Sequence, residues 1–500
     1  MFLGIDVGTF ESKGVLVASD GTVLAEARRR HGIDSPEVGH FEQDPEKVWW
    51  ADVVSIAQEL TGRPEASNIS GVAVSAIGPC VVATDENLRP LRPAILYGID
   101  TRASRQIDSL LLSIGADEIS ERSGNALTSQ SAGPKIAWLK DEEPEIWAQS
   151  RWFMTSQSFL VAKLTGEVTI DHATAGYFHP LYDLATGQWN VSGCEDFVDA
   201  AQLPRIGWST EIAGLVTAAA AAETGIPFGT PVIIGTTDAP AEAVGAGVVA
   251  DGQLMAMYGS SGYFIRVGDR LRVAPQLWSA PFVFENTYVL ASGTSTAGTA
   301  TRWIADMFSL TEEQDDLTFT SLIALAAQSE PGSRGVLALP HFAGERTPFQ
   351  DSTSRAVVIG LDLQHSRADV ARALLEGVGH SIAAAILAFN SADAPITRVT
   401  AIGGATKNRF IIGTVSTVIG LEQDVADTAG AAFGDAFLAA MGVGAIRDPS
   451  EISAWVRVRE TIRPDEATRD ALASDHEDYM ALYEALAPLQ RKRNRKHDGQ

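Results

Sequence analysis

The sequence predicts an α/β protein built from two similar domains. Its 500 residues exceed what one hydrophobic core usually supports, so two domains are expected. Residues 2–17 contain an apolar strand, a short turn of small polar residues and a second apolar strand, and residues 254–265 repeat this pattern. Further apolar strands lead into helical patterns through turns rich in glycine and proline, which is the alternation of an α/β fold.

The composition restricts the partners and the compartment. A net charge of −25 argues against nucleic acid or an anionic membrane as a general partner. Cys80 and Cys194 lack metal-type spacing, which excludes a disulfide framework or a structural zinc site and fits a reducing cytoplasm. The N-terminus has a strand pattern rather than that of a signal peptide, and no segment approaches the ~20 uninterrupted apolar residues of a membrane span.

The first strand and turn form a candidate phosphate site. Asp6 lies where the strand ends, a usual place for a carboxylate that holds Mg²⁺ through water. Gly8, Thr9 and Ser12 follow, and the amides and hydroxyls of such a turn can surround a phosphate. Asp20-Gly21 then marks a hairpin. An ordinary hairpin would carry the same residue types, so this stretch alone leaves both interpretations open.

A helix is expected to begin at Asp44, which can cap it, with Pro45 in its first turn. Apolar residues then recur at helical spacing up to Leu60. Residues 71–77 form a buried strand that ends in the turn Gly78-Pro79-Cys80. Because ligands of α/β proteins tend to lie at the carboxyl ends of strands, this turn is a candidate site.

A third apolar run, residues 93–102, ends in Asp100 and Arg102. These two charged side chains could hold a polyhydroxylated ligand. They could equally form a surface ion pair, and the residues alone favour the surface pair.

Asp238 follows the strand pattern at residues 231–236 and precedes a helix with Pro240 in its first turn. It is placed to cap that helix, which by itself implies no function. It could also be a carboxylate that the positive end of the helix keeps ionised, available to accept a hydroxyl proton.

Glycines at residues 245–252 indicate a domain boundary, so the domains are expected at 1–247 and 248–447. Residues 448–500 are expected to form acidic helical segments and a basic, disordered tail from Arg491. The two repeated turns, facing each other, would hold the phosphates of a nucleotide between the domains.

Several motifs, in this order and spacing, resemble the FGGY family of carbohydrate kinases, within the actin and hexokinase-like ATPase fold. Residues 4–13 look like the family's first phosphate loop, residues 259–262 like its second, and residues 403–408 like its adenine-side motif. Residues 344–348, Gly-Glu-Arg-Thr-Pro, are similar to its characteristic pentapeptide. The resemblance covers the chain from Phe2 to about Gly444.

The two longer signatures of the family agree unequally. Residues 356–376 satisfy the second FGGY signature at every position. The first signature, around Lys135, is only partly kept, because Ala132 stands where Ser, Thr or Pro is usual. The resemblance implies two ribonuclease H-like (actin-like ATPase) domains with a nucleotide and sugar cleft between them.

The resemblance also implies the residue roles. Asp238 would be the general base, Asp6 would organise Mg²⁺, and ATP would be the phosphoryl donor. The substrate side would comprise Gly78, Pro79, Asp100, Arg102 and Asp238. The nucleotide side would comprise Thr9, Ser12, Lys13, Gly259, Ser260, Ser261, Gly298, Arg302, Gly404, Ala405 and Asn408.

The departures from the family lie on the sugar side. Gly78-Pro79 stands where xylulose kinases have a larger residue and a His, and Ala239 follows Asp238 where relatives have Asn or Gln. Tyr97 stands where a Trp is common. The small residues Gly78 and Ala239 are expected to leave room for a longer or differently branched sugar.

A ketopentose such as xylulose is nevertheless the expected substrate, with glycerol, a tetritol or a longer ketose as alternatives within the family. An ATP-binding regulator or chaperone-type ATPase on the same fold is the alternative from another class. Relatives are commonly dimeric, so a second copy of the chain is an expected partner beside the sugar or polyol.

Overall fold

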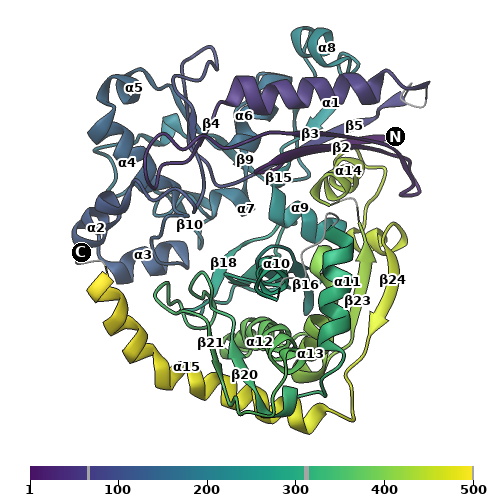
Figure 1. Ribbon diagram of the computed structural model, residues 1–500. Coiled ribbons are helices and arrows are strands. Elements are labelled where there is room, and N and C mark those ends of the chain that lie inside the picture. The colour runs from purple at the N-terminus through teal and green to yellow at the C-terminus, as the bar shows by residue number, and fades with distance from the viewer. Residues whose placement is uncertain (65–67, 309–314, 429, 498–500) are drawn as a thin grey trace.

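The computed structural model describes residues 1–64, 68–308, 315–428 and 430–497, and it contains two large sheets (Figure 1). The first sheet has the strand order β13-β14-β5-β1-β2-β3, and β15 also pairs with β5. Its strands are β1 (Phe2–Val7), β2 (Glu11–Val17), β3 (Val23–Arg30), β5 (Gly71–Ala76), β13 (Ile212–Leu215), β14 (Pro231–Ile233) and β15 (Thr236–Thr237). The predicted hairpin is confirmed, because β2 and β3 pair antiparallel across the Asp20-Gly21 turn.

The second sheet has the order β18-β19-β17-β16-β22-β23-β24. Its strands are β16 (Gln253–Tyr258), β17 (Gly262–Gly268), β18 (Trp278–Pro281), β19 (Tyr288–Thr294), β22 (Arg398–Ile402), β23 (Gln423–Asp427) and β24 (Arg457–Ile462).

The two sheets repeat one topology. In the first, β1 pairs antiparallel with β2 and parallel with β5, and in the second β16 pairs antiparallel with β17 and parallel with β22. The order β3-β2-β1-β5-β14 therefore corresponds to β19-β17-β16-β22-β23. This confirms the repeated pattern and the two-domain α/β fold expected from the sequence.

Residues between the strands of the first sheet supply its helices. The predicted helix start is confirmed, since Asp44 Oδ1 accepts hydrogen bonds from the amides of Glu46 and Lys47. A short π-helical turn (Pro45–Trp50) continues into α1 (Ala51–Thr61). The other helices are α2 (Ser104–Ser113), α3 (Ala116–Ser123), α4 (Ala132–Glu142), α5 (Pro144–Gln149), α6 (Ser156–Thr165), α7 (His172–Ala175), α8 (Ala218–Thr224) and α9 (Asp238–Gly245).

Short strand pairs complete this part of the chain. Residues 165–200, for which the sequence predicted no regular structure, contain three of the strands in these pairs. The pairs are β4 (Glu42–Gln43) with β7 (Ala94–Ile95), β6 (Val82–Thr84) with β8 (Trp152–Met154), β9 (Thr169–Asp171) with β12 (Arg205–Gly207), and β10 (Tyr182–Asp183) with β11 (Gln188–Trp189).

The helices of the second half are α10 (Gly298–Met307), α11 (Asp315–Ala326), α12 (Arg367–Leu387), α13 (Arg409–Ile419), α14 (Ala431–Gly442) and α15 (Arg469–His497). A further strand pair, β20 (Leu337–Leu339) with β21 (Val357–Ile359), lies beside α12. Within the described residues, one helical segment, 367–392, is long and apolar enough to cross a membrane. Because 83% of its apolar window is buried, it is a core helix of the second domain.

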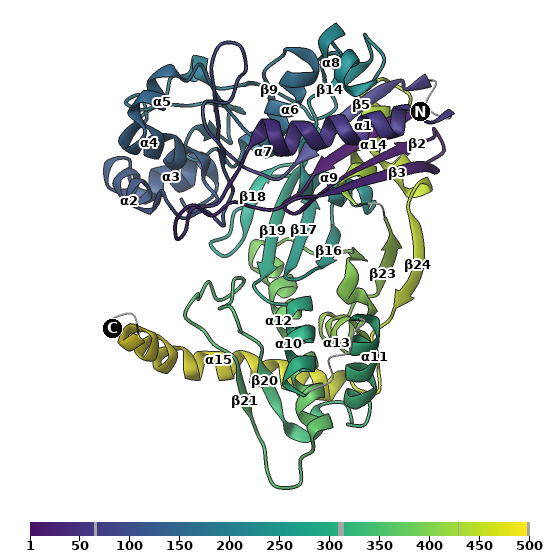
Figure 2. The same ribbon diagram turned by 45° about the horizontal axis from the view of Figure 1, so that its top comes forward.

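Helix α14 joins the two domains. It packs against β1, β5 and α9 of the first domain, although along the chain it lies between β23 and β24 of the second sheet (Figure 2). The contact is close, because a Cβ atom on Gly4 would lie 1.9 Å from the carbonyl oxygen of Ala432, and one on Gly434 equally close to that of Ala241. The small residues of α14 and of its partners allow this close approach of the backbones. The predicted boundaries thus divide the chain by sequence order rather than by packing.

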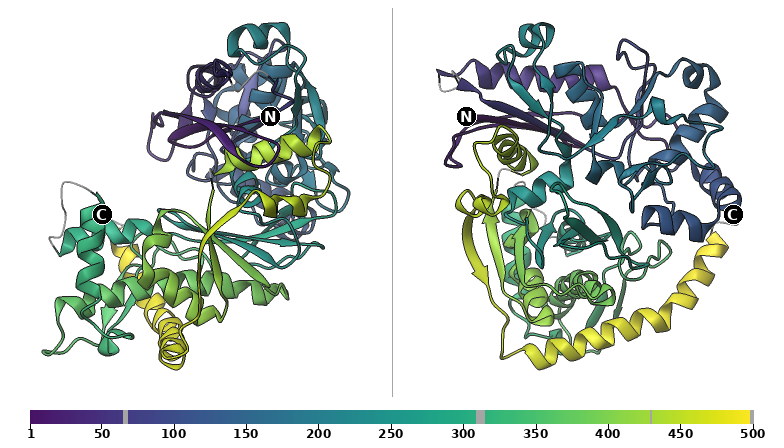
Figure 3. Two further views of the ribbon diagram at one scale, coloured as in Figure 1. Left: turned by 90° about the vertical axis from the view of Figure 1, so that its right-hand side faces the viewer. Right: turned by 180° about the vertical axis from the view of Figure 1, so that it is seen from behind.

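The C-terminal segment corrects one prediction. The basic tail was expected to be disordered, but α15 continues to His497 and runs along the outer edge of the second domain (Figure 3). Tyr479 and Tyr483 are buried against Leu339 and Ala384. Arg491 forms an ion pair with Asp351 at 3.3 Å. The basic residues therefore continue a helix whose apolar face is anchored on the second domain. The prediction of disorder was wrong because it rested on the charged run alone.

Candidate active site

A cavity of about 220 Å³ lies between the two domains and contains the catalytic residue predicted from sequence. It is lined from the first domain by Gly78, Pro79, Tyr97, Gln130, Thr237 and Asp238, and from the second by Ser261, Tyr263 and Arg346, among others. A larger hollow of about 740 Å³, between Trp152 and Trp189, contains none of the predicted site residues. The interdomain cavity is therefore the candidate active site.

Asp238 lines this cavity as the first residue of α9. The helix cap is Thr237, one residue earlier, so the predicted capping role of Asp238 is wrong, while Pro240 lies in the first turn as expected. Burial raises the pKa of Asp238 to about 6, although a hydrogen bond from the amide of Ala239 at 2.9 Å favours the charged form. A carboxylate with a pKa just below neutral can accept a proton at physiological pH.

Other carboxyl groups surround Asp238. Burial and the charge of Asp238 raise the pKa of Glu242 to about 7. Burial and the charges of Asp238, Asp435 and Glu242 raise the pKa of Asp6 well above its usual range. The like charges destabilise one another, so a bound cation would favour the ionised forms.

Ser75 divides its hydrogen bonds unequally within this group. Its hydroxyl lies 2.6 Å from Asp435 Oδ2 and 3.1 Å from Asp6 Oδ1, and its amide donates to Asp435 at 3.2 Å. The hydroxyl thus lies within hydrogen-bond distance of both carboxyl groups. A carboxylate among like charges fits a site that holds Mg²⁺ together with phosphate oxygens and water. Within the described ranges no three His, Cys, Asp or Glu residues are grouped so as to hold a metal by themselves.

The first phosphate loop connects β1 and β2. Lys13 lies directly opposite Asp6 in this antiparallel pair, so both side chains project from the same face of the sheet. The Thr9 hydroxyl lies 3.2 Å from that of Tyr97, which lines the cavity. Ser12 differs, because its buried hydroxyl donates to Asp52 of α1 at 2.7 Å. The phosphate contact predicted for the Ser12 side chain does not fit this geometry.

The second phosphate loop, residues 259–262, meets the start of α10. The amide of Gly298 donates to the carbonyl of Gly259 at 2.9 Å, and the Ser260 carbonyl accepts from the amide of Ala297 at 3.0 Å. A Cβ atom on Gly298 would lie 2.7 Å from Gly259 O and 3.6 Å from the Cβ of Ala405. The structure therefore brings together the second loop, the start of α10 and Ala405.

The remaining residues predicted on the nucleotide side differ in exposure. The Arg302 side chain on α10 is about half exposed, and its Nε lies 3.6 Å from Asp306 Oδ1. A Cβ atom on Gly404 would have no neighbour within 4 Å, so the space beside this glycine is open. Asn408 is fully buried, and its Oδ1 accepts from the amide of Phe410 to cap α13. Its Nδ2 has no hydrogen-bond partner among the described residues, and the contact predicted with adenosine stays a prediction.

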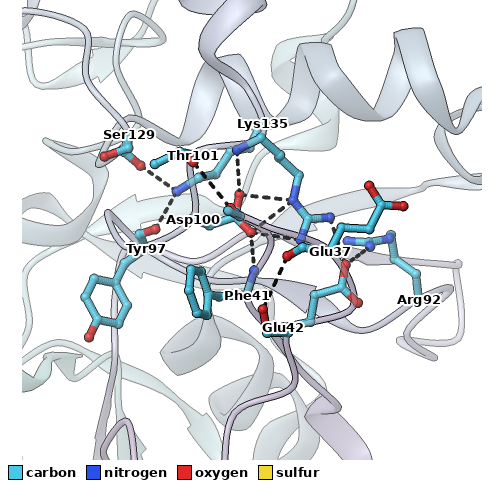
Figure 4. Close-up of polar contacts among 12 residues, drawn as sticks. Glu37, Phe41, Glu42, Arg92, Tyr97, Asp100, Thr101, Ser129 and Lys135 are labelled. Carbon is cyan, nitrogen blue, oxygen red and sulfur yellow. Dashed lines mark hydrogen bonds and ion pairs between the residues drawn. The ribbon is translucent and has the colours of Figure 1, made fainter. Parts of the chain in front are cut away.

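Asp100 and Arg102 form a buried network, so their interpretation as a surface pair is wrong. Both side chains are 0% exposed, and the guanidinium donates to Asp100 Oδ2 at 2.8 Å and to Glu42 at 2.8 Å. Asp100 also accepts from the amide of Phe41 at 2.7 Å (Figure 4). Neither residue is among those that line the interdomain cavity. They lie behind its wall, and direct contact with a sugar stays a prediction.

Lys135 extends this support. Its ammonium donates to the carbonyls of Tyr97, at 3.0 Å, and Ser129, at 2.7 Å (Figure 4). Burial lowers its pKa to about 8. Tyr97 and Gln130, the neighbour of Ser129, both line the cavity. Lys135, which belongs to the partly kept first signature, therefore fixes two parts of the cavity wall.

Arg346 is a cavity residue to which the sequence assigned no role. Its guanidinium donates to the carbonyls of Gly262, at 3.2 Å, and Thr294. The neighbouring Glu345 accepts from Ser381 Oγ at 2.6 Å and from the amide of Ser295 at 2.8 Å. The pentapeptide was the available signal, but only the fold shows that its arginine lines the same cavity as Asp238.

Gly78 does not provide the extra room expected from its size. A Cβ atom on Gly78 would lie 2.4 Å from Cγ2 of Thr237. The methyl group of Thr237 already fills that space, so the prediction of a larger sugar pocket at this position is wrong. Ala239 was the other small residue, and the cavity does include it.

Comparisons with known proteins agree with this arrangement. Residues 1–245 match the FGGY family of carbohydrate kinases, N-terminal domain, and residues 254–443 match the C-terminal domain of that family. The chain is 30% identical over 492 residues to a xylulose kinase of Staphylococcus epidermidis, covering 97% of this chain and 96% of that protein. It is 27% identical to a gluconokinase of Bacillus subtilis, covering 81% and 80% of the two chains.

A solved structure shows the same fold. The xylulose kinase from Rhodospirillum rubrum superposes with a TM-score of 0.91 at 28% identity, covering 98% of this chain and 99% of that one. Similarity over almost the whole length includes both domains and the cavity between them.

Proposed function

Because the chain belongs to the FGGY family of carbohydrate kinases, and so transfers a phosphoryl group from ATP to a sugar or polyol, we propose that it phosphorylates a ketopentose such as xylulose with Asp238 as the general base. Glycerol, a tetritol or a longer ketose are the alternatives within the family. The family match favours the kinase over an actin-like regulator on the same fold.

The position of Asp238 is the observation that supports this proposal most directly. It is a buried carboxylate at the wall of the interdomain cavity, with a pKa of about 6, and the second phosphate loop reaches the same cavity through Ser261. A sugar hydroxyl beside Asp238 would attack the γ-phosphorus of ATP. Its proton would pass to the carboxylate as the bond to ADP breaks. Since phosphoryl transfer depends mainly on positioning and charge neutralisation, one weak base suffices.

The nucleotide would lie between the two phosphate loops. Thr9 and Lys13 in the first, and Gly259, Ser260 and Ser261 in the second, would contact its phosphates. Gly298 and Arg302 would line the nucleotide cleft, and Gly404, Ala405 and Asn408 would hold the adenosine end. Mg²⁺, held by Asp6 through water, would neutralise charge on the phosphates when bound. Lys13, opposite Asp6, is the nearest cation that the first loop supplies.

The substrate assignment draws on the relatives and on the cavity. Several similar proteins are named xylulose kinases. Gly78, Pro79 and Asp238 line the cavity and would contact the sugar, while Asp100 and Arg102 would support its wall from behind. The methyl group of Thr237 leaves no enlarged pocket at Gly78, which favours a substrate of ordinary family size.

The test is ADP release with xylulose, ribulose, glycerol, erythritol, fructose and gluconate, each with and without enzyme. We expect turnover to depend on sugar and to be greatest with xylulose. Asp238→Asn should lower kcat by at least ~100-fold while ADP still binds. Asp20→Asn, at the exposed hairpin turn, is the matched control and should retain activity.

Two outcomes would overturn parts of the proposal. Comparable turnover in Asp238→Asn would remove Asp238 from its role as base. Sugar-independent hydrolysis of ATP, unchanged in that variant, would favour the regulator instead.

We also propose a cytoplasmic enzyme, because Cys80 and Cys194 are free and buried. A homodimer stays a prediction from the resemblance, and analytical ultracentrifugation would test it.

A further inference from the structure

Three successive carbonyl groups of the first phosphate loop, those of residues 8–10, have hydrogen-bond partners outside the loop. The carbonyl oxygen of Gly8 lies 3.0 Å from His31 Nε2, and that of Thr9 accepts from Gln43 Nε2 at 3.0 Å. The carbonyl oxygen of Phe10 accepts from the amide of His31 at 3.0 Å. Three successive carbonyls therefore point toward residues that are no part of the phosphate loop, and two of these bonds come from His31.

The partners of His31 fix its protonation. The Gly8 carbonyl can only accept, so Nε2 must carry a hydrogen. The Asp52 carboxylate lies 2.8 Å from Nδ1 and already accepts from the Ser12 hydroxyl at 2.7 Å, so Nδ1 must also donate. With a hydrogen on both nitrogens the ring is an imidazolium. The His31 side chain is only 8% exposed, and Asp52 16%, so water screens the pair weakly.

The other charged groups near His31 have partners of their own. On β3, which ends at Arg30 just before His31, Arg29 donates to Glu59 and Ser55 of α1, both at 2.8 Å. On β2 and β3, Lys13 and Arg28 are paired with Glu26, and Arg28 also with Glu11. Gln43 on β4 is neutral. Asp52 is therefore the counter-ion of the ring.

The geometry of a peptide bond connects this pair to the ligand side of the loop. In a planar trans peptide the C=O and N–H groups point in opposite directions. Since the Gly8 carbonyl points toward His31, the N–H of Thr9, which belongs to the same peptide, points away from it. The Thr9 side chain reaches Tyr97 at the cavity wall, so that side of the loop faces the cleft. A charged donor on the carbonyl also strengthens the N–H as a donor.

We propose that His31, protonated and paired with Asp52, is a positioning residue that directs the Gly8–Thr9 peptide N–H toward the nucleotide phosphates. It rests on the proposed function for the location of the nucleotide. His31 itself touches neither ATP nor sugar. Its contribution is to hold a donor in place that would otherwise rotate with the loop.

The proposal implies a dependence on pH. The hydrogen bonds to Asp52 and to the Gly8 and Thr9 carbonyls outweigh burial and raise the pKa of His31. A raised pKa means that the arrangement is complete below the ordinary value, near 6.5, and is lost as pH rises through the value in the folded protein. Nucleotide affinity should therefore weaken on the alkaline side.

The test compares wild type with His31→Ala, His31→Gln and Asp52→Asn, using the affinity for ADP by calorimetry and the KM for ATP from pH 6 to 9. We expect His31→Ala to weaken ADP affinity and raise the KM for ATP about tenfold at pH 7, with kcat and the KM for sugar changed less than about threefold. His31→Gln can still donate one neutral hydrogen bond, so it should recover part of the affinity and show no alkaline decline. Asp52→Asn should shift that decline to lower pH.

The control is His365→Gln, because His365 lies 2.9 Å from Asp362 and 3.2 Å from a carbonyl oxygen of Arg334, far along the chain in the second domain. It should behave like wild type. A thermal unfolding curve for each variant shows that it is folded. If His31→Ala does not fold, the pH profile of nucleotide affinity in His31→Gln decides whether the proposal holds.

The proposal fails if the ADP affinity of His31→Ala lies within twofold of wild type, or if His31→Gln keeps the alkaline decline. ADP binding needs neither sugar nor catalysis, so this result is separate from the assigned base. Wild-type turnover in Asp238→Asn would remove Asp238 from its role as base and leave the His31 result intact.

Discussion

The hydroxyl of Ser75 lies 2.6 Å from Asp435 Oδ2, joining β5 of the first domain to α14, which lies between two strands of the second sheet along the chain. Asp435 is fully buried, and its other oxygen, Oδ1, has no hydrogen-bond partner among the described residues. Burial raises its pKa well above the usual range. A carboxyl group at this contact is therefore more favourable protonated than ionised.

We predict that Asp435→Asn raises the melting temperature, and does so more at pH 8 than at pH 5. The raised pKa means that the wild-type carboxyl stabilises the fold when protonated and loses that contribution as pH rises. The neutral amide keeps the shape without the cost of ionisation. Thermal unfolding at both pH values measures this. The exposed Asp427→Asn should show no such difference, and a lower melting temperature for Asp435→Asn at pH 8 would contradict the prediction.

We predict that kcat/KM for the sugar falls below about pH 6. Asp238 must be ionised to accept the hydroxyl proton, and its pKa is about 6. The pKa of Glu242 is raised further, to about 7, so this carboxyl is mostly protonated while Asp238 titrates, and Glu242→Gln should leave the acid limb in place. Steady-state kinetics from pH 5 to 8 test both. An acid limb that moves to lower pH in Glu242→Gln would show that Glu242 is charged while Asp238 titrates.

We predict that Gly78→Ala destabilises the protein by about 1–3 kcal/mol, because the new methyl group would overlap Cγ2 of Thr237. Thr237→Ser removes that methyl group, so the double variant should recover much of the loss. Urea unfolding of the four proteins gives the coupling. Gly413→Ala is the control, since its Cβ would meet open space on α13. Equal losses in the single and double variants would rule out Thr237 as the cause.

We predict that α15 loosens in acid before the rest of the protein unfolds. Burial lowers the pKa of His341 to about 4, of His380 to about 3 and of His476 to about 4. A lowered pKa means that stability is lost as pH falls below about 6.5, by about 2 kcal/mol at pH 5 for His341 alone. His341 bonds to Tyr479 of α15 at 2.8 Å.

Hydrogen exchange of residues 469–497 at pH 7.5 and 5, corrected for the intrinsic rate, measures this loosening. His380→Leu should reduce the pH dependence, because the His380 ring nitrogen Nδ1 has no partner among the described residues. Equal corrected protection at the two pH values would contradict the prediction.

Local patterns were enough for the elements and the general location of the site. The alternating apolar runs, the Asp20-Gly21 turn and the Asp44 cap each depend on residues close in sequence, and the structure confirms them. The order of the motifs along the chain also indicated the family. These features are local, or are shared with relatives, and therefore appear in one sequence.

The failed predictions have a common cause. The surface pair of Asp100 and Arg102 proved buried because Glu42 and Phe41, about 60 residues earlier, complete the network. The tail from Arg491 is helical because Asp351 and Tyr483 hold it. Ser12 turned from the cleft because Asp52 accepts its hydroxyl. In each case the deciding partner lies too far along the chain for composition or spacing to show it.

The sequence by itself determined the two-domain α/β fold, the kinase family and the place of Asp238 between a strand and a helix. Hydrophobic periodicity and a strand that leads into a helix are encoded locally. Only the tertiary structure decided which polar groups face the cavity and which form hydrogen bonds behind its wall. Hydrogen bonds and burial set the direction and the charge of a side chain, and those depend on neighbours brought together by folding. His31 illustrates this, because its two partners, Gly8 and Asp52, fix its protons and lie 23 and 21 residues away.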